Sequence, residues 1–191
     1  MPAQQLAVDV GCYTTLMLKF PTTVLLTFIL STTFAQTDKK VSTYLSAQYD
    51  NTIYDKTKGN NPWGIGLGLE SRLNNSTRFK PTVELTASIY LEDDKTLTTI
   101  NDIPLQDVRN MVNLFAGYSF NPTNKLSISC VAGPSFISGQ TFLSIKPSID
   151  IFFSKNNRWT AKAYYINIFN REKITGSDFG LVGFALGIKL L

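Results

Sequence analysis

The stretch from Trp63 to Arg72, Trp-Gly-Ile-Gly-Leu-Gly-Leu-Glu-Ser-Arg, constrains this chain more than any other part of it. Successive side chains of a β-strand point to opposite sides, so large apolar residues share one face and Glu70 and Arg72 share the other. In a soluble sheet the apolar face would meet a core. In a membrane barrel it would meet lipid, with small and charged side chains in the lumen. The stretch therefore predicts a strand, and the rest of the chain must decide what its apolar face contacts.

Other segments alternate in the same way, and we expect strands at 41–49, 79–91, 108–120, 126–136, 143–153, 159–169 and 182–190. Short turns are expected around 74–76, 121–124 and 154–158. Polar connections are expected at 51–62, 92–106, 138–140 and 170–178. Outer-membrane barrels have an even number of strands, with short turns on one side and longer loops on the other. The pattern predicts an all-β, eight-stranded, antiparallel, up-and-down transmembrane β-barrel.

The apolar rows of strands two to eight contain no charged residue, whereas the opposite rows carry many. We expect a charge network in a polar, packed lumen, formed by Glu70, Arg72, Lys80, Glu84, Arg109, Lys146 and Asp150. Each carboxylate is expected to find a cation, because an unpaired buried charge is costly. Lys162 and Lys189 share this row and are expected nearer the inner rim, extending toward water. Glycines in the same rows leave room for these long side chains.

Aromatic residues gather at both ends of the apolar rows, as two membrane interfaces require. One predicted girdle comprises Tyr49, Trp63, Phe136 and Phe169, and the other comprises Phe79, Phe120, Phe153 and Trp159. A mean hydropathy of +0.01 suits a barrel whose residues are half lumenal. The alternative is a soluble, lipocalin-like barrel with an apolar ligand cavity, although the Gly-x-Trp start typical of lipocalins is missing.

The N-terminal region indicates export. Residues 17–35 combine Lys19, an apolar run from Val24 to Leu30, and small residues before Gln36, which is the pattern of a signal peptide. Residues 1–16 do not fit a signal and are interpreted as a start-site extension, with translation beginning at Met17. The barrel domain is expected to span 36–191, in which Cys130 has no cysteine partner.

From these residues the chain resembles the small outer-membrane β-barrel proteins of Gram-negative bacteria. The resemblance covers about residues 36–191 and is carried by the signal ending, the Trp-Gly-x-Gly-x-Gly strand and the final stretch 183–191. It implies outer-membrane lipid around the barrel and insertion by the barrel-assembly machinery. The family usually ends in an aromatic residue, whereas this chain ends in Leu191.

The absence of histidine excludes Ser-His-acid triads and most zinc sites, and with them the enzymes of this architecture that depend on histidine. Glu70 with Glu84 could form an acid/base pair, but neutralisation of nearby cations is the favoured interpretation. No catalytic residue, cofactor or metal is predicted; the acidic residues 92–94 are interpreted as a solvated loop. A net charge of +4 without a basic run gives no sign of nucleic-acid binding.

The sequence therefore predicts a non-enzymatic outer-membrane barrel whose surface loops bind a protein or surface ligand, mediate adhesion or support the envelope. A narrow channel for small solutes remains the alternative within the same fold, and a soluble ligand-binding barrel remains the alternative outside it.

Overall fold

The computed structural model describes residues 41–53, 63–91, 99–100, 103–104, 108–170 and 179–191. The predicted start-site extension and signal peptide lie outside these residues. No helix in the described part of the chain is long and apolar enough to cross a membrane. Residues 40–191 form one compact unit, which contains the barrel.

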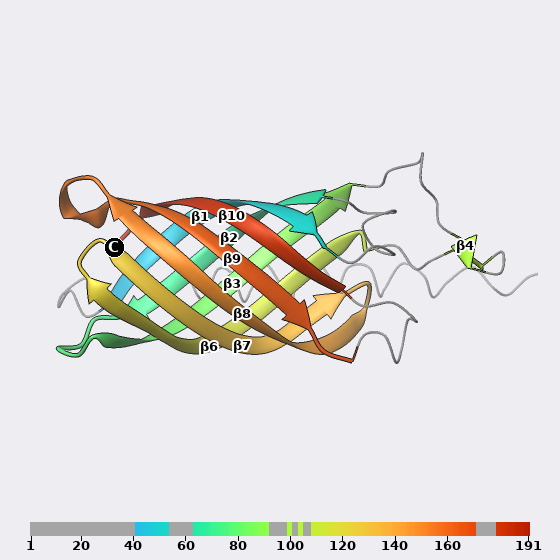
Figure 1. Ribbon diagram of the computed structural model, residues 1–191, viewed down its shortest axis with the longest axis horizontal. Helices are drawn as coiled ribbons and strands as arrows, with labels where there is room; N and C mark the ends of the chain where they lie inside the picture. Colours follow the sequence, from blue (N-terminus) through green and yellow to red (C-terminus); the bar gives the residue numbers. More distant parts are fainter. Residues whose placement is uncertain (1–40, 54–62, 92–98, 101–102, 105–107, 171–178) are drawn as a thin grey trace, which may run out of the picture. The chain divides into compact units, whose positions relative to one another are not determined.

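Eight antiparallel strands close into a barrel in the order β1-β10-β9-β8-β7-β6-β3-β2 (Figure 1). The fold and the up-and-down topology agree with the prediction. The barrel strands are β1 (Val41–Thr52), β2 (Trp63–Leu73), β3 (Phe79–Leu91), β6 (Asn110–Thr123), β7 (Leu126–Ile137), β8 (Gln140–Phe153), β9 (Trp159–Ile168) and β10 (Phe179–Lys189).

The two ends of the barrel differ in their connections. We call the end with connections 74–78, 124–125 and 154–158 the turn end, and the opposite end the loop end. The strand start at Val41 and the C-terminus both lie at the turn end, on the left in Figure 1. The connection 92–109 contains the short antiparallel pair β4 (Thr99–Ile100) and β5 (Ile103–Pro104), which the sequence did not predict.

Strand boundaries follow the alternation closely, with small differences at the loop end. β6 begins at Asn110 rather than 108, although the carbonyl of Arg109 still accepts a hydrogen bond from Tyr90 N at 3.0 Å. β10 begins earlier than predicted, at Phe179, whose side chain is buried. The extension of β10 was missed because Phe179 points inward and so does not continue an outward apolar row.

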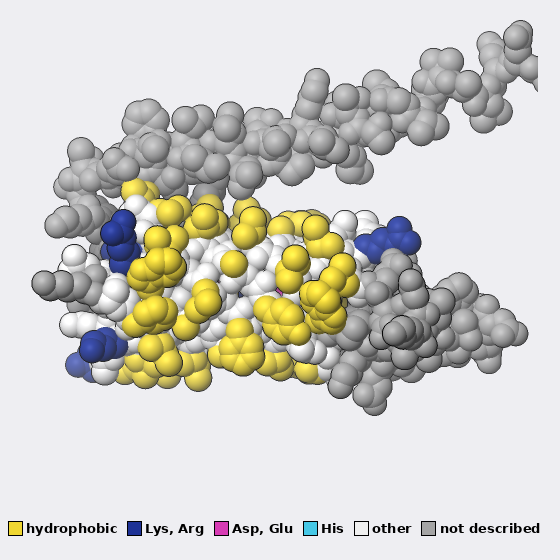
Figure 2. Space-filling view, turned by 90° about the horizontal axis from the view of Figure 1, so that it is seen from above, with side chains coloured by type: hydrophobic (Ala, Val, Ile, Leu, Met, Phe, Trp, Pro, Cys, Tyr) yellow, Lys and Arg dark blue, Asp and Glu magenta, His cyan; other side chains and the backbone are white. Residues whose placement is uncertain are grey.

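Large apolar side chains cover the outside of the barrel wall, and on the face shown in Figure 2 lysine and arginine side chains lie near the two ends. Leu67, near the middle of β2, is 61% exposed. The residues proposed as girdles all point outward, with Phe120 half-buried and the others exposed. Tyr49 stacks on Trp63 at the loop end, with ring centroids 6.1 Å apart. At the turn end, the corresponding centroid distance between Phe79 and Phe120 is 4.9 Å.

The register places Phe153 directly opposite Trp159, as the odd-numbered turn between them predicts. The same alternation places the charged row inside, where most of the buried polar residues lie. An outward apolar wall around a polar row is the inverse of a soluble sheet, in which the apolar face forms the core.

Candidate functional site in the barrel interior

Six charged side chains meet inside the barrel between its middle and its turn end. They come from four strands: Glu70 and Arg72 from β2, Glu84 from β3, Lys146 and Asp150 from β8, and Lys162 from β9. All six are buried, and Lys146 and Asp150 have no exposed side-chain surface. Because β2 and β3 are adjacent in register, Glu70 lies opposite Glu84. Two carboxylates so placed need cations from the far side of the barrel.

Lys162 lies at the centre of this charge network. Its Nζ forms ion pairs with Glu70, with Glu84 at 3.4 Å and with Asp150 at 3.6 Å. Lys146 Nζ donates to Glu84 Oε1 at 2.6 Å. Arg72 completes the set, because its Nε donates to Glu70 and its Nη2 donates to Asp150 Oδ2 at 2.9 Å. Three carboxylates therefore face three cations, and the formal charges of these six groups cancel.

The structure does not bring every predicted member into this network. Arg109 is exposed just before β6, and Lys80 Nζ donates to Asn74 Oδ1 at 3.4 Å near the turn end. Lys162, predicted to extend toward water at the rim, is buried in the centre instead, so that prediction was wrong. The residue lies opposite Asp150 in the β8–β9 register, and this pairing directs its side chain inward rather than along the strand.

A fourth buried carboxylate, Asp50 on β1, was not predicted from the sequence. Its Oδ2 accepts hydrogen bonds from Ser88 Oγ at 2.7 Å and from Tyr90 OH at 3.2 Å, and its Oδ1 accepts one from Tyr164 OH. Three hydroxyl groups thus replace the hydration of this acid. The available signal was its even number, which places it on the face of β1 opposite the apolar row. The predicted strand ended at residue 49, one residue before Asp50, whereas β1 continues to Thr52.

Apolar side chains fill the lumen near the loop end, which corrects the expectation of a polar interior. The buried cluster consists of Tyr90, Val108, Met111, Phe115, Val131, Ile137, Phe142, Tyr164, Ile166, Ile168, Phe179, Leu181 and Ala185. Most of these residues lie in the half of their strand next to the loop end. We call this group the apolar layer. Inward apolar residues do not disturb an outward apolar row, so the alternation alone did not distinguish them.

Glycines make space for the large inward side chains. A Cβ at Gly183 would lie 2.3 Å from the ring of Tyr164, and a Cβ at Gly64 would lie 2.8 Å from the ring of Tyr90. Both tyrosines donate to Asp50. The glycines opposite them therefore permit the aromatic rings to reach the carboxylate, as expected for a narrow lumen.

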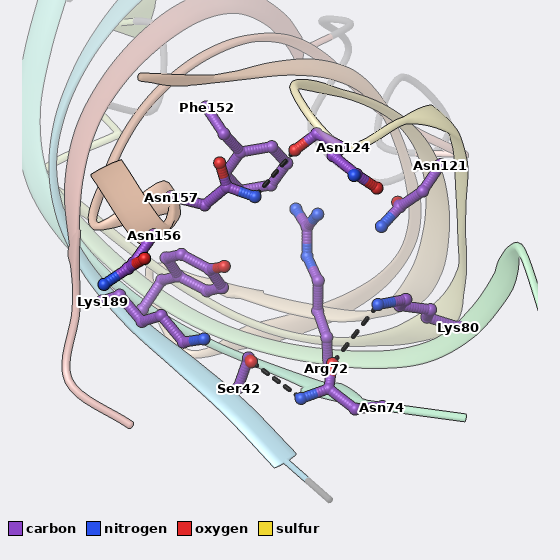
Figure 3. Close-up of a pocket in the computed structure, with 11 residues that line it drawn as sticks. Ser42, Arg72, Asn74, Lys80, Asn121, Asn124, Phe152, Asn156, Asn157 and Lys189 are labelled. Carbon is purple, nitrogen blue, oxygen red and sulfur yellow. Dashed lines mark hydrogen bonds between the residues drawn. The ribbon is translucent and has the colours of Figure 1, made fainter. Parts of the chain in front are cut away.

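A polar pocket of about 300 Å³ opens at the turn end (Figure 3). Arg72 lies at its centre, and Lys80 and Lys189 extend toward it from opposite sides in the view shown. Tyr44 and Phe152 form part of the wall, with the Arg72 guanidinium 5.7 Å and 5.2 Å from their ring centroids. We call this space the turn-end pocket.

In the charge network, each carboxylate is paired with lysine or arginine side chains. Glu70 and Glu84 share Lys162, so neither is an isolated acid or base. Among the residues that the structure describes, no group of three or more potential metal ligands comes together. Cys130, also within the described part, is exposed on the outer wall.

Comparison with known proteins identifies solved structures of similar fold. No protein-family model matches the sequence, and no curated protein matches it. The crystal structure of Ail, the attachment invasion locus protein of Yersinia pestis, matches with a TM-score of 0.50 and 13% identity over 78% of this chain and 95% of that chain. The crystal structure of Neisserial surface protein A matches with a TM-score of 0.50 and 8% identity over 79% of this chain and 96% of that chain. This chain has the fold of the small outer-membrane β-barrels.

For a small outer-membrane barrel fold, the observed filling of the interior is physically reasonable. Eight strands enclose a space only just wide enough for side chains to occupy. Here the apolar layer occupies the half of the lumen next to the loop end, and the charge network occupies the region between the middle of the barrel and the turn end.

Proposed function

We propose that the protein is a non-enzymatic outer-membrane protein whose closed barrel anchors surface loops for binding, adhesion or envelope integrity. The observation that carries this proposal is the filled lumen. The apolar layer and the charge network follow one another along the lumen from the loop end toward the turn end. The barrel wall around them carries apolar side chains on its outer face. A scaffold needs this construction, whereas a transport pathway needs a continuous polar passage.

The filled lumen argues against the channel alternative on energetic grounds. A solute entering from the loop end would have to displace side chains such as Phe115 and Leu181, which have no exposed surface. Nearer the turn end, the solute would meet ion pairs that are already formed, such as that of Lys146 with Glu84. Opening a buried pair leaves an uncompensated charge, which costs several kcal/mol, about 3–5.

The connections of the barrel support a role for the loop end. Segments 53–62, 92–109 and 169–178 and the short turn 138–139 connect strands there, whereas 74–78, 124–125 and 154–158 connect them at the turn end. Loops carry binding function more often than the scaffold that positions them. The proteins of similar fold are named as an attachment invasion locus protein and a surface protein, and we propose a surface role here as well.

The proposal includes the route to the membrane. Residues 17–35 direct export, the mature chain begins near Gln36, and the barrel-assembly machinery inserts it into outer-membrane lipid. The ligand of the loops is a protein or another component of a surface, and nucleic acid is not a partner.

Conductance and loop exchange test this function together. We expect pure wild-type protein in a planar lipid bilayer to pass little current. Replacement of 92–106 by a short Gly/Ser linker should leave the barrel folded in membranes. Cells that carry this variant in their outer membrane should no longer bind the surface that cells carrying the wild type bind. The matched control replaces 154–158 at the turn end. Steady ion-selective currents would promote the channel alternative, and recovery of the mature chain in the soluble fraction would promote the soluble barrel.

A further inference from the structure

Each barrel strand that begins at the turn end follows a lysine or an arginine in the sequence. The pairs, at the starts of β1, β3, β7 and β9, are Lys40-Val41, Arg78-Phe79, Lys125-Leu126 and Arg158-Trp159. The structure describes the last three of these cations. Of the four described strands that begin at the loop end, only β6 follows a cation, Arg109. Positive charge before the strands is therefore a property of one end of the barrel.

Backbone hydrogen bonds hold the three described cations, Arg78, Lys125 and Arg158, at this end. Their carbonyl oxygens accept hydrogen bonds of 2.8–2.9 Å from backbone N–H groups of the adjacent strands β6, β8 and β10. All three residues are exposed. On the face shown in Figure 2, lysine and arginine side chains lie beside the apolar wall at the turn end. We call these three residues the turn-end rim.

The residue after each of these cations belongs to the outward apolar row. Phe79 and Trp159 are 59% and 46% exposed, and Leu126 is half-buried. Outward aromatic residues mark the boundary between hydrocarbon and headgroups. One more residue along a strand adds at most about 3.3 Å, and the headgroup region on each side of a bilayer is about 5–8 Å thick. The backbone of each rim cation therefore lies at the depth of the headgroups.

Aspartate and glutamate side chains do not offset this charge within the part of the chain that the structure describes. All four described Asp and Glu side chains are buried in the lumen. The three turn-end connections contain no Asp or Glu. A terminal carboxylate at Leu191, at the same end of the barrel, would cancel at most one positive charge. The surface at the turn end is thus positive and complements an anionic one.

We propose that the turn-end rim is a docking surface for the headgroups of anionic phospholipids in the leaflet that meets this end of the barrel. At headgroup depth, a guanidinium or ammonium group can donate hydrogen bonds to a lipid phosphate while its methylene stem stays against the apolar wall. A zwitterionic headgroup also presents a phosphate, but its own cation repels the rim. The inference rests on the placement of the barrel in a bilayer, which belongs to the proposed function, and not on what the loops bind.

The two tryptophans of the chain report on the two ends of the barrel separately. Trp159 follows Arg158 at the turn end, and Trp63 starts β2 at the loop end. Trp63→Phe leaves Trp159 as the reporter, and Trp159→Phe leaves Trp63. The mature chain is refolded into phosphatidylcholine vesicles containing phosphatidylglycerol or phosphatidylcholine brominated on the acyl chains near the headgroup. Fluorescence quenching by each brominated lipid gives the relative binding constant of the two lipids beside that tryptophan.

With Trp159 as the reporter, we expect phosphatidylglycerol to bind about fivefold more tightly than phosphatidylcholine at low salt, and less than about twofold more tightly at about 1 M salt. The triple variant Arg78→Gln/Lys125→Gln/Arg158→Gln should lower the low-salt preference below about twofold. Arg78→Lys/Arg158→Lys should keep it, because the charge is retained. The matched control is Arg109→Gln, which removes an exposed cation at the loop end and should also keep it.

Loss of the preference in the triple variant, with retention in the lysine pair and in Arg109→Gln, supports the proposal. With Trp63 as the reporter, the triple variant should change nothing. Equal binding of the two lipids beside Trp159 at low salt overturns the proposal and leaves the rim to an acidic partner outside the membrane.

If the triple variant does not refold, the salt dependence in the Trp63→Phe protein decides, and a preference that salt does not reduce overturns the proposal. Absence of quenching of Trp159 by either brominated lipid would overturn the membrane placement itself, and the inference with it. Failure of the proposed function is thereby distinguished from failure of the headgroup preference alone.

Discussion

Replacement of Glu84 by glutamine is expected to destabilise the barrel strongly, because it removes the anion that compensates Lys146. Lys146 Nζ lies 2.6 Å from Glu84 Oε1, and its side chain is 0% exposed. Among the described residues, no second carboxylate lies within ion-pair distance of Lys146. Lys162 differs, since it also contacts Glu70 and Asp150. Removing one partner of a buried pair costs about 3–5 kcal/mol, and Glu84→Gln should fall in this range.

Equilibrium unfolding by urea in lipid vesicles, followed by tryptophan fluorescence, measures this free energy. Lys146→Met is expected to cost less, about 1–3 kcal/mol, because Glu84 retains Lys162. The double variant Glu84→Gln/Lys146→Met should recover part of the loss, since it leaves no unpaired ammonium. A coupling free energy of about 0.5–3 kcal/mol is expected between the two sites.

Arg109→Gln is the matched control, because Arg109 is charged but exposed outside the network. It should change the unfolding free energy by no more than about 0.5 kcal/mol. The reasoning would be refuted by a cost below about 1 kcal/mol for Glu84→Gln, a value typical of an exposed pair. Strict additivity of Glu84→Gln and Lys146→Met would also refute it.

Three further experiments test the wall and the apolar layer. Leu67→Arg should cost about 2–4 kcal/mol of folding free energy in vesicles and Trp63→Arg only about 0–1, because Trp63 is nearer an interface; equal costs would contradict the placement of the membrane. Phe115→Ala should cost about 3–5 kcal/mol by leaving a cavity in the apolar layer, and a native-like urea midpoint would show that the layer is not packed. Alanine substitutions at Phe153 and Trp159 should show a coupling of about 0.2–1 kcal/mol in a double-mutant cycle, and zero coupling would indicate that their register contact contributes nothing.

The two halves of the lumen have different energetic roles. The apolar layer gains stability from burial and excludes water near the loop end. The charge network is a weaker source of stability, because desolvation offsets much of the attraction within each pair. It does impose specificity, since a register shift by one residue would turn Glu84 and Lys146 toward lipid.

Alternation along the chain was enough to predict the strands, their direction and the face on which each residue lies. Leu67 outward and Glu70 inward follow from the two-residue period of a strand, which is a local property of the backbone. The opposition of Phe153 and Trp159 also follows, because a short turn sets the register of the strands that it joins.

Which inward residues contact one another was decided only by the tertiary structure. Lys162 and Glu70 are 92 positions apart and meet across the lumen, and Asp50 meets Tyr164 over a separation of 114. Such contacts depend on the stagger accumulated around the closed barrel, which sets the depth of each residue relative to strands that are not its neighbours. The same stagger gathers Phe115 and Phe179 into the apolar layer and leaves Arg109 outside the network. A pattern of period two specifies the side of a residue but not its depth, so closure of the barrel determines the site.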